Sequence, residues 1–370
     1  MEGPRQPIES EYPQVLEFLD HRLRPGSKWS IASEYPTALG PQNLSNIRII
    51  TEAQKVVSHA VLKPLIIKTP QVIFKIGAIG SVVTDEQHRN QGLSRMILEN
   101  CLTEAKAQDC DIAVLWTNLY DFYRKLNFEL GGSEVACVFN EEFSGESAGA
   151  ANNLKFIKGN QVSAEAIHRL YSQHTVGSIR TIEDIRKFLA IPQTQLTTAW
   201  DEKGQLAAYA VEGKGADLTG YVHEWGGKVS ALLALFSFIR RDKKEAFTLI
   251  VPQHSKNLLA ALAMLPVSIN HGYLGMIKIV NFEGLAGKIK RAARTLGISD
   301  VVLERQNGLS GRVETVFGMG KDLVVISDDR ALTQVLFGPF PMIDSFSEQT
   351  NTTLSKLFPL PLWIWGWDSV

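Results

Sequence analysis

The sequence has 370 residues, 45% of them hydrophobic and 21% charged, a composition that predicts folded cores and excludes a disordered chain. At about 100 to 200 residues per domain, this length predicts two or three domains. Lys and Arg total 38 against 39 Asp and Glu, so the formal net charge is −1, and no long basic block could neutralise a phosphate backbone. We therefore expect no nucleic-acid partner.

The cysteines and the apolar runs favour a cytoplasmic protein. Cys101, Cys110 and Cys137 are an odd number without a C-x-x-C spacing, which argues against a disulfide framework and against a zinc site. The segment Met1–Ser10 holds charges and prolines where a signal peptide has an apolar core. The longest apolar run, Val229–Ile239, is far shorter than the ~20 residues that span a bilayer. We expect no metal, no secretion and no membrane span.

The first part of the chain predicts the element order α, β, β, β, α, β, α, β. Apolar residues at helical spacing alternate there with runs of β-branched residues, and turn residues separate these segments. The expected elements are a helix over Tyr12–Leu23, strands over Ile47–Thr51, Lys55–Ile67 and Gln71–Thr84, a helix from Gly92, a strand over Asp111–Trp116, a short helix over Leu119–Leu126 and a closing strand over Glu134–Phe139.

The segment Phe143–Asn153 is rich in Gly, Ser, Ala and Asn and is the predicted linker to a second domain. Beyond it a similar layout follows, so we interpret the second domain as a degenerate repeat of the first. Its expected elements are helices over Ser163–Gln173 and Ile182–Leu189, a hairpin of Gln195–Trp200 and Gln205–Glu212, a strand over Gly220–Trp225, a helix over Ala231–Arg240, a strand over Ala246–Val251 and a helix over Lys256–Ala263.

The chain from Met276 onward predicts a small α+β domain. It offers an amphipathic helix over Phe282–Leu296, three short strand runs and a helix over Asp329–Leu336. Its last residues, Leu362–Val370, are rich in tryptophan, as expected of a terminus that is buried and not frayed.

The stretch Ser81–Arg95 carries the strongest chemical signal. A strand ends there, a polar loop follows, and Gly92 lies at a helix entry. A helix start presents unpaired backbone N–H groups and the positive end of the helix dipole, and a glycine lets a pyrophosphate approach closely. Arg89 and Arg95 can add charge-assisted hydrogen bonds. The loop therefore predicts a phosphate site, although short glycine motifs also occur in ordinary turns.

Arg89-x-x-Gly92-x-Ser94, preceded by Val82-Val-Thr84, resembles the acetyl-CoA motif of the GNAT N-acetyltransferase superfamily. That family has Gly or Ala where this chain has Ser94, which is also small. Further on, Asp121–Phe128 is similar to the second signature of the family, with Asn127 in place of a glycine. Asn tolerates the same left-handed backbone conformation, so the turn can survive. The specific part of this resemblance covers residues 72–132.

The whole layout resembles the bacterial Eis-type branch of that superfamily. The resemblance implies an α/β (α+β) fold: a GNAT fold with a mixed, mainly antiparallel sheet in residues 1–145, a degenerate GNAT-like domain in residues 150–275 and a small sterol-carrier-like (SCP2-like) domain in residues 276–370. It also implies a homo-oligomer, namely a hexamer.

The function implied is acetyl-CoA-dependent transfer of an acetyl group to a primary amine, of a small molecule such as an aminoglycoside or a polyamine, or of a protein. The resemblance assigns Tyr123 as general acid and the carboxylate of Val370 as general base. Cofactor contacts are implied at Val82, Val83, Thr84, Arg89, Asn90, Gln91, Gly92, Leu93, Ser94, Arg95, Asn118 and Leu119.

Each of these roles has an alternative. Tyr123 could be only a core aromatic residue, and the end of the chain could be an apolar tail packed on the third domain or on a membrane interface. His59 lies on a predicted strand, where a lone histidine is more often structural than catalytic. The second domain lacks an Arg-x-x-Gly loop, so we expect it to bind no cofactor. As a function from another class, the chain could be a non-catalytic CoA- or lipid-binding regulatory protein.

Overall fold

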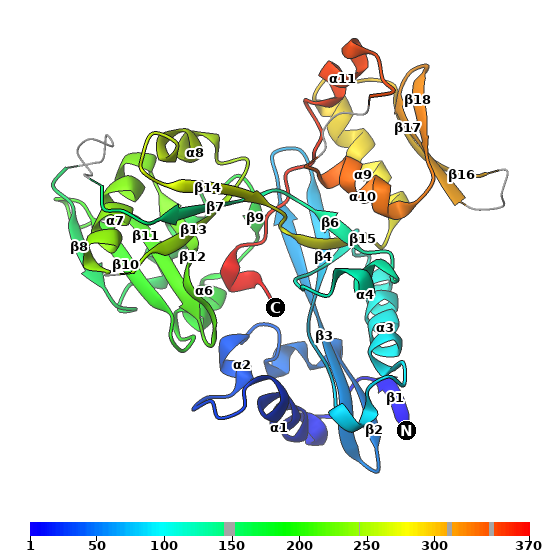
Figure 1. Cartoon of the computed structure of the whole chain (residues 1–370), viewed down its shortest axis with the longest axis horizontal. Coiled ribbons are helices and arrows are strands. Elements are labelled where there is room, and N and C mark those ends of the chain that lie inside the picture. The colour runs from blue at the N-terminus through cyan, green and yellow to red at the C-terminus, as the bar shows by residue number, and fades with distance from the viewer. Residues whose placement is uncertain (144–151, 244, 309–312, 340–343) are drawn as a thin grey trace.

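The computed structural model of the chain describes residues 1–143, 152–243, 245–308, 313–339 and 344–370 (Figure 1). Over these residues it is an α/β protein in which helices cover two large mixed sheets and one small antiparallel sheet. Most strand pairs are antiparallel, with parallel pairs between β4 and β5 and between β12 and β13. The predicted fold class is confirmed. Most of the predicted linker Phe143–Asn153 lies outside the described residues.

The first sheet has the strand order β1-β2-β3-β4-β5-β15-β6, and the short strand β9 pairs with the far end of β3. Helices α3 and α4 cover one face and α1 and α2 the other, because neighbouring residues of each strand point to opposite faces. These elements are β1 (Glu2–Arg5), α1 (Tyr12–Leu23), α2 (Ile31–Glu34), β2 (Ile47–Glu52), β3 (Lys55–Lys68), β4 (Ile73–Thr84), α3 (Leu93–Ala107), β5 (Ile112–Leu115), α4 (Tyr120–Arg124), β6 (Glu129–Gly131), β9 (Gly177–Ser178) and β15 (Gly275–Ile279).

The second sheet has the order β14-β7-β13-β12-β11-β10-β8. On β11, Ala208 and Ala210 face helices α7 and α8, whereas Tyr209 and Val211 face α5 and α6, so the sheet is covered on both sides. These elements are β7 (Glu134–Phe139), β8 (Lys155–Lys158), α5 (Ala164–Tyr171), α6 (Ile182–Leu189), β10 (Gln195–Trp200), β11 (Leu206–Lys214), β12 (Asp217–Gly227), α7 (Val229–Asp242), β13 (Phe247–Pro252), α8 (Lys256–Leu262) and β14 (Ser268–Gly272).

The two large sheets exchange strands across the predicted domain boundaries. Residues Glu134–Phe139 form a strand, as predicted, but the prediction that they close the first sheet is wrong, because β7 lies between β13 and β14 of the second sheet. The space beside β5 is instead filled by β15, which pairs with both β5 and β6. Pattern alone identifies a strand and not its partners, so the exchange could not be predicted from the sequence.

We call the two large sheets with their helices the first and second units, and the small antiparallel sheet with its helices the third unit. Its antiparallel sheet has the order β16-β17-β18, and α9 packs along it. The elements are α9 (Phe282–Thr295), β16 (Val301–Asn307), β17 (Val313–Met319), β18 (Asp322–Ile326), α10 (Asp329–Phe337) and α11 (Glu348–Leu354).

The last residues of the chain leave the third unit and run between the two large sheets, where they end in a single turn of 3-10 helix, η4 (Gly366–Asp368) (Figure 1). Trp363, Trp365 and Trp367 of this segment are buried. The expectation of a buried terminus is confirmed. The segment packs on the second sheet and its helices, where Trp367 stacks on Phe188 and Tyr209.

Candidate active site

The first sheet opens between β4 and β5. Parallel pairing joins these strands only from Ile76 opposite Ile112 to Ala78 opposite Val114, while β4 continues to Thr84. Gly80 lies just past the last pair, and the backbone carbonyl group of Val370 rests against it. A Cβ placed on Gly80 would lie 2.5 Å from the terminal carbonyl carbon of Val370. The absence of a side chain at this position therefore makes room for the end of the chain in the opening.

A bulge follows directly on β4. Ser81 takes a φ of +49°, and the register against β3 shifts between His59 and Val61. His59 is fully buried, and burial lowers its pKa to about 4, so the ring is neutral at pH 7. Its Nδ1–H then donates to the Ser81 carbonyl oxygen at 2.8 Å. His59 is therefore a structural residue that holds the bulge, as its position on a strand favoured.

The loop from β4 to α3 presents free backbone donors. Asn90 and Gly92 have left-handed backbones, with φ of +63° and +79°, and Gly92 is the N-cap of α3. Because a glycine offers no capping side chain, the first N–H groups of this 15-residue helix receive no side-chain cap. Space in front of Gly92 is open, since a Cβ added there would have no atom within 4 Å. The loop can therefore bind an anion.

The two arginines of the loop are exposed. Arg89 lies 3.5 Å from Glu86 and Arg95 lies 2.8 Å from Glu99, and both side chains are more than half accessible. Such surface pairs contribute little to stability, so either guanidinium can turn toward a phosphate at small cost. Gln91 is exposed as well, whereas Leu93 points into the core.

Ser94, the departure from the family pattern, joins the helix to the strand. Its hydroxyl lies 2.9 Å from the Thr84 hydroxyl, which in turn lies 2.9 Å from the hydroxyl of Ser58 on β3. Val82 and Val83 precede Thr84 on β4, both partly exposed. The serine thus fixes the start of α3 against the end of β4 without filling the space in front of the loop.

The residues after β5 form the other side of the opening. Asn118 and Leu119 are exposed, and Leu119 is the N-cap of α4. Tyr123 on α4 is buried in the same apolar cluster as Ile79 and Leu93, and burial raises its pKa. Asn127 takes a φ of +62°, which confirms the left-handed turn predicted for it.

A cavity of about 790 Å³ extends from this opening between the two large sheets, and we call it the central cavity. Its acidic side chains are those of Glu134 and Asp217, Val370 also lines it, and no lysine or arginine occurs among the described residues that line it. Burial raises the pKa of Glu134 to about 7. The aromatic lining residues are Tyr35, Trp116, Tyr120, Tyr273 and Trp363. Carboxylates and aromatic faces together suit a cationic ligand.

The family assignment agrees with this geometry. Residues 9–131 match the family model of the acetyltransferase (GNAT) domain. These residues form a GNAT acetyltransferase domain. The GNAT domain therefore contains the opening between β4 and β5, the loop before α3 and Tyr123, and acyltransferases are the enzyme class to which such a domain belongs.

Solved structures share the fold over nearly the whole chain. A GCN5-related N-acetyltransferase from Anabaena variabilis superposes with a TM-score of 0.66 at 15% identity, covering 99% of both chains. A probable N-acyltransferase from Enterococcus faecalis gives 0.64 at 14% identity, covering 97% of this chain and 96% of that one. Eis1 from Mycobacterium abscessus gives 0.54 at 12% identity, covering 90% and 88%. No curated protein matches the chain significantly.

Sequence reasoning missed two features around the GNAT domain. A glycine inside a strand often marks the close approach of another backbone, so Gly80 carried a usable signal. No signal in the sequence connected the central cavity to the second sheet, because Glu134 and Asp217 reach it only through the tertiary fold. Among the described residues, no cluster of His, Cys, Asp or Glu could hold a metal ion, and no helix is long and apolar enough to cross a membrane.

Proposed function

We propose that this protein transfers the acetyl group of acetyl-CoA to a primary amine held in the central cavity. The observation that carries the proposal is the Val370 carboxylate, which rests against Gly80 in the opening of the GNAT domain and also lines the central cavity. One group thus borders both the place where a GNAT domain takes its thioester and the cavity that suits an amine.

The cofactor would lie along the opening. Val82, Val83 and Thr84 would pair through their backbones with the pantetheine arm, and an N–H of this segment would stabilise the oxyanion. The pyrophosphate would bind the backbone N–H groups of the loop Arg89–Arg95, at the uncapped start of α3. Asn118 and Leu119 would contact the cofactor from the opposite side.

In the reaction, the amine nitrogen attacks the thioester carbonyl carbon, a C–N bond forms and the C–S bond breaks. The Val370 carboxylate accepts a proton from the amine, directly or through water, and the Tyr123 phenol donates a proton to the departing CoA thiolate. Because burial raises the pKa of Tyr123, the phenol stays protonated at neutral pH and is available as an acid.

The acceptor would be a cationic small molecule such as a polyamine or an aminoglycoside. Trp116 and Tyr273 supply aromatic faces for an ammonium group, and a bound ammonium would favour the ionised form of Glu134, whose pKa burial raises to about 7. Asp217 is already paired with Arg24 at 2.6 Å. Glu134 therefore is the freer of the two side-chain carboxylates for a second ammonium of the acceptor.

The organisation of the whole chain remains part of the proposal. We describe it as a GNAT domain, a degenerate GNAT-like unit and a sterol-carrier-like unit, with boundaries near residues 145 and 275. Strand β7 of the GNAT domain joins the second sheet, whereas β9 and β15 join the first. A cytoplasmic homo-oligomer, namely a hexamer, and the absence of a cofactor in the second unit stay predictions.

The first test is calorimetric titration of the purified protein with acetyl-CoA. Gly92→Glu places a carboxylate in front of the loop and should abolish micromolar binding by electrostatic repulsion. Gly204→Glu is the matched control, because Gly204 also has a positive φ, +71°, and open space around it. Intact mass spectrometry of the same sample would test whether Val370 carries the terminal carboxylate.

The second step is a screen of amines with acetyl-CoA, read as the mass gain of one acetyl group. Acetyl transfer that is lost in Gly92→Glu and on removal of Val370 would support the proposal. Binding of acetyl-CoA without transfer to any polyamine or aminoglycoside would favour the CoA-binding regulatory function instead. No binding to the unmodified protein would overturn the assignment of the loop.

A further inference from the structure

The turn that carries Ser369 and Val370 is held by a buried lysine. Lys214 ends β11 and is 1% exposed. Its Nζ donates to the backbone carbonyl oxygens of Gly366 at 2.9 Å, Trp367 at 3.2 Å and Ser369 at 2.6 Å, and to the Ser369 hydroxyl at 3.2 Å. Every side-chain hydrogen bond described for this ammonium therefore ends on the last turn of the chain.

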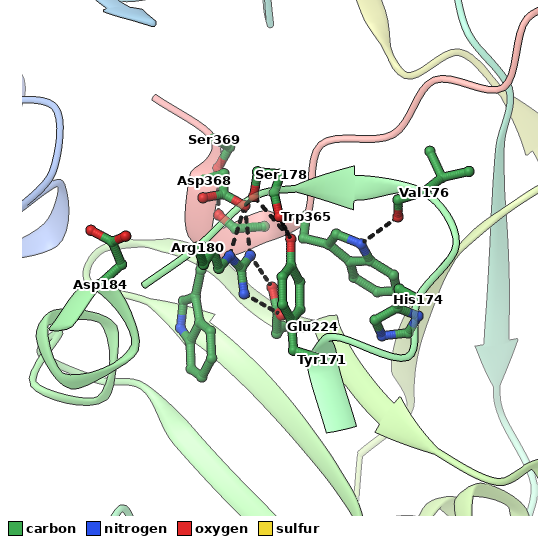
Figure 2. Close-up of polar contacts among 12 residues, drawn as sticks. Tyr171, His174, Val176, Ser178, Arg180, Asp184, Glu224, Trp365, Asp368 and Ser369 are labelled. Atoms are coloured by element: carbon green, nitrogen blue, oxygen red, sulfur yellow. Dashed lines mark hydrogen bonds and ion pairs between the residues drawn. The ribbon is translucent and has the colours of Figure 1, made fainter. Parts of the chain in front are cut away.

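A buried arginine holds the same turn through its side chain. Arg180 Nη2 and Nε lie 2.7 and 2.9 Å from one Asp368 carboxylate oxygen, and Ser178 donates to that oxygen as well (Figure 2). The other edge of the guanidinium pairs with Glu224 of β12 at 2.7 and 3.0 Å, and Arg180 Cζ lies 3.8 Å from the centre of the Tyr171 ring (Figure 2). Arg180 is therefore itself immobilised by the second unit.

The two buried side chains differ in whether a carboxylate compensates their positive charge. Asp368 and Glu224 compensate the charge of Arg180, and although burial acts to lower its pKa, their fields hold that pKa above the ordinary value. No carboxylate among the described residues lies within 4 Å of Lys214 Nζ, which has only carbonyl and hydroxyl acceptors and the Tyr35 ring at 4.5 Å. A buried ammonium without an ion pair is unfavourable, and an apolar residue of similar size is often tolerated better.

Because a buried, unpaired Lys214 is unfavourable for stability, we looked to the segment that it holds, Leu362–Val370, which we call the tail. Hydrogen bonds to backbone carbonyls fix the direction of the chain whatever side chains it carries. Only Ser369 and Val370 follow the clamped turn, and Val370 must reach Gly80 on the other large sheet. A loosened turn would let the carboxylate leave the opening while both sheets stayed folded.

We propose that Lys214 and Arg180 are positioning residues, which clamp Gly366–Ser369 on the second unit and thereby hold the Val370 carboxylate in the opening of the GNAT domain. This inference rests on the proposed function, in which that carboxylate is the base. The degenerate second unit would then serve as the support of a catalytic group that belongs to the first.

The test compares Lys214→Met, Lys214→Arg and unmodified protein. Hydrogen–deuterium exchange of the peptide 362–370 reports the clamp without reference to activity. The exchange is measured at pH 6, where the Lys214 side chain is protonated. We expect exchange in that peptide to be about tenfold faster in Lys214→Met, because charge-assisted hydrogen bonds are lost, and to be partly restored in Lys214→Arg. Turnover should fall about tenfold with an unchanged Kd for acetyl-CoA. Lys243→Met is the control, since Lys243 pairs with Glu212, which lies on β11 as Lys214 does, and forms no described contact with residues 362–370.

Two further measurements keep the outcomes distinct. Ser369→Ala removes one acceptor from the tail side and should give a smaller increase in exchange, even if Lys214→Met were to fold poorly. Unchanged exchange of peptide 362–370 in a folded Lys214→Met protein would overturn the clamp. If removal of Val370 left turnover intact while Lys214→Met still accelerated exchange, the clamp would stand and the assignment of the base would fall.

Discussion

Each of the two large units has a strand that leads into a helix and pairs with a parallel strand, and the two junctions differ in the length of the connecting loop. In the first, β4 and α3 are separated by the open segment Asp85–Gly92, which leaves a helix start exposed in front of free space. In the second, only Lys228 separates β12 from α7, so no loop can cradle a pyrophosphate. In the proposed function, the first unit uses its opening for the cofactor, whereas buried charges of the second unit hold the end of the chain. If the proposal holds, the second unit has no binding loop of its own but still contributes to catalysis.

We expect the largest effect on turnover from Gly80→Ala. Its Cβ would overlap the Val370 carboxylate, so the end of the chain must leave its position. We expect kcat to fall about 100-fold, as for loss of a catalytic group, with acetyl-CoA binding retained. Gly287→Ala on α9 is the control, because only the Arg291 side chain lies near its Cβ, at 3.7 Å. Full activity in Gly80→Ala would show that the position of Val370 is irrelevant to turnover.

Tyr123→Phe tests the chemistry assigned to the first unit alone. The ring packs on Phe122 and Phe128, with centroids 5.0 and 5.9 Å apart, so removal of the hydroxyl should leave the fold intact. We expect a loss of about 30-fold in kcat, with KM for acetyl-CoA unchanged, because proton transfer to the thiolate loses its donor. Steady-state kinetics across pH 6 to 10 would measure this loss. An unaltered rate on a good substrate would make Tyr123 a core residue only.

Burial of Lys214 in the second unit should make the free energy of unfolding depend on pH. Burial lowers the pKa of Lys214 from 10.5 to about 7. Between those pH values the unfolded chain keeps a proton that the folded protein has released, so raising the pH favours the folded protein. In unmodified protein, we expect this group to add on the order of 1–2 kcal/mol to the free energy of unfolding between pH 7 and 8.5.

Denaturant unfolding of unmodified protein and Lys214→Met at both pH values isolates that contribution, since other titrating groups cancel in the difference. Lys214→Met should lack the rise and should be at least as stable as unmodified protein at pH 7. A parallel pH dependence in the two proteins would mean that the ammonium is not desolvated as described.

The smallest effect concerns the serine that ties α3 to β4. Ser94→Ala removes the hydrogen bond to Thr84 and should cost about 1 kcal/mol of stability, with acetyl-CoA affinity within twofold. Thr103→Ala is a control on the exposed side of the same helix, where the hydroxyl bonds only the Glu99 carbonyl. A large loss of affinity in Ser94→Ala would assign that hydroxyl to the cofactor and not to the junction.

Local features of the fold followed from the sequence. The helix Tyr12–Leu23 was predicted with its observed bounds, and the strand Glu134–Phe139 likewise, because periodicity and turn residues act over short ranges. The sheet to which that strand belongs depends on contacts with residues more than a hundred positions away, which no local pattern records. The short strand β15 was not predicted at all, since it is five residues long and follows another strand closely.

The candidate site shows the same limit. The loop Arg89–Arg95 could be found because its chemistry is contiguous in sequence, and the tail could be expected to be buried because tryptophans are costly to expose. Lys214 and Arg180 could not be found, because a lysine at a strand end and an arginine before a helix look like surface residues until the fold buries them.

The exchanged strands also set an order of events in synthesis. As the chain leaves the ribosome, residues 1–131 can form β1 to β5 and β6, but the place between β5 and β6 stays vacant until Gly275–Ile279 has emerged. The facing edges of β5 and β6 therefore stay unpaired until the whole second unit has been made, and unpaired edges invite aggregation. A fragment cut at residue 131, the end of the GNAT match, would keep those edges permanently, so we expect it to aggregate.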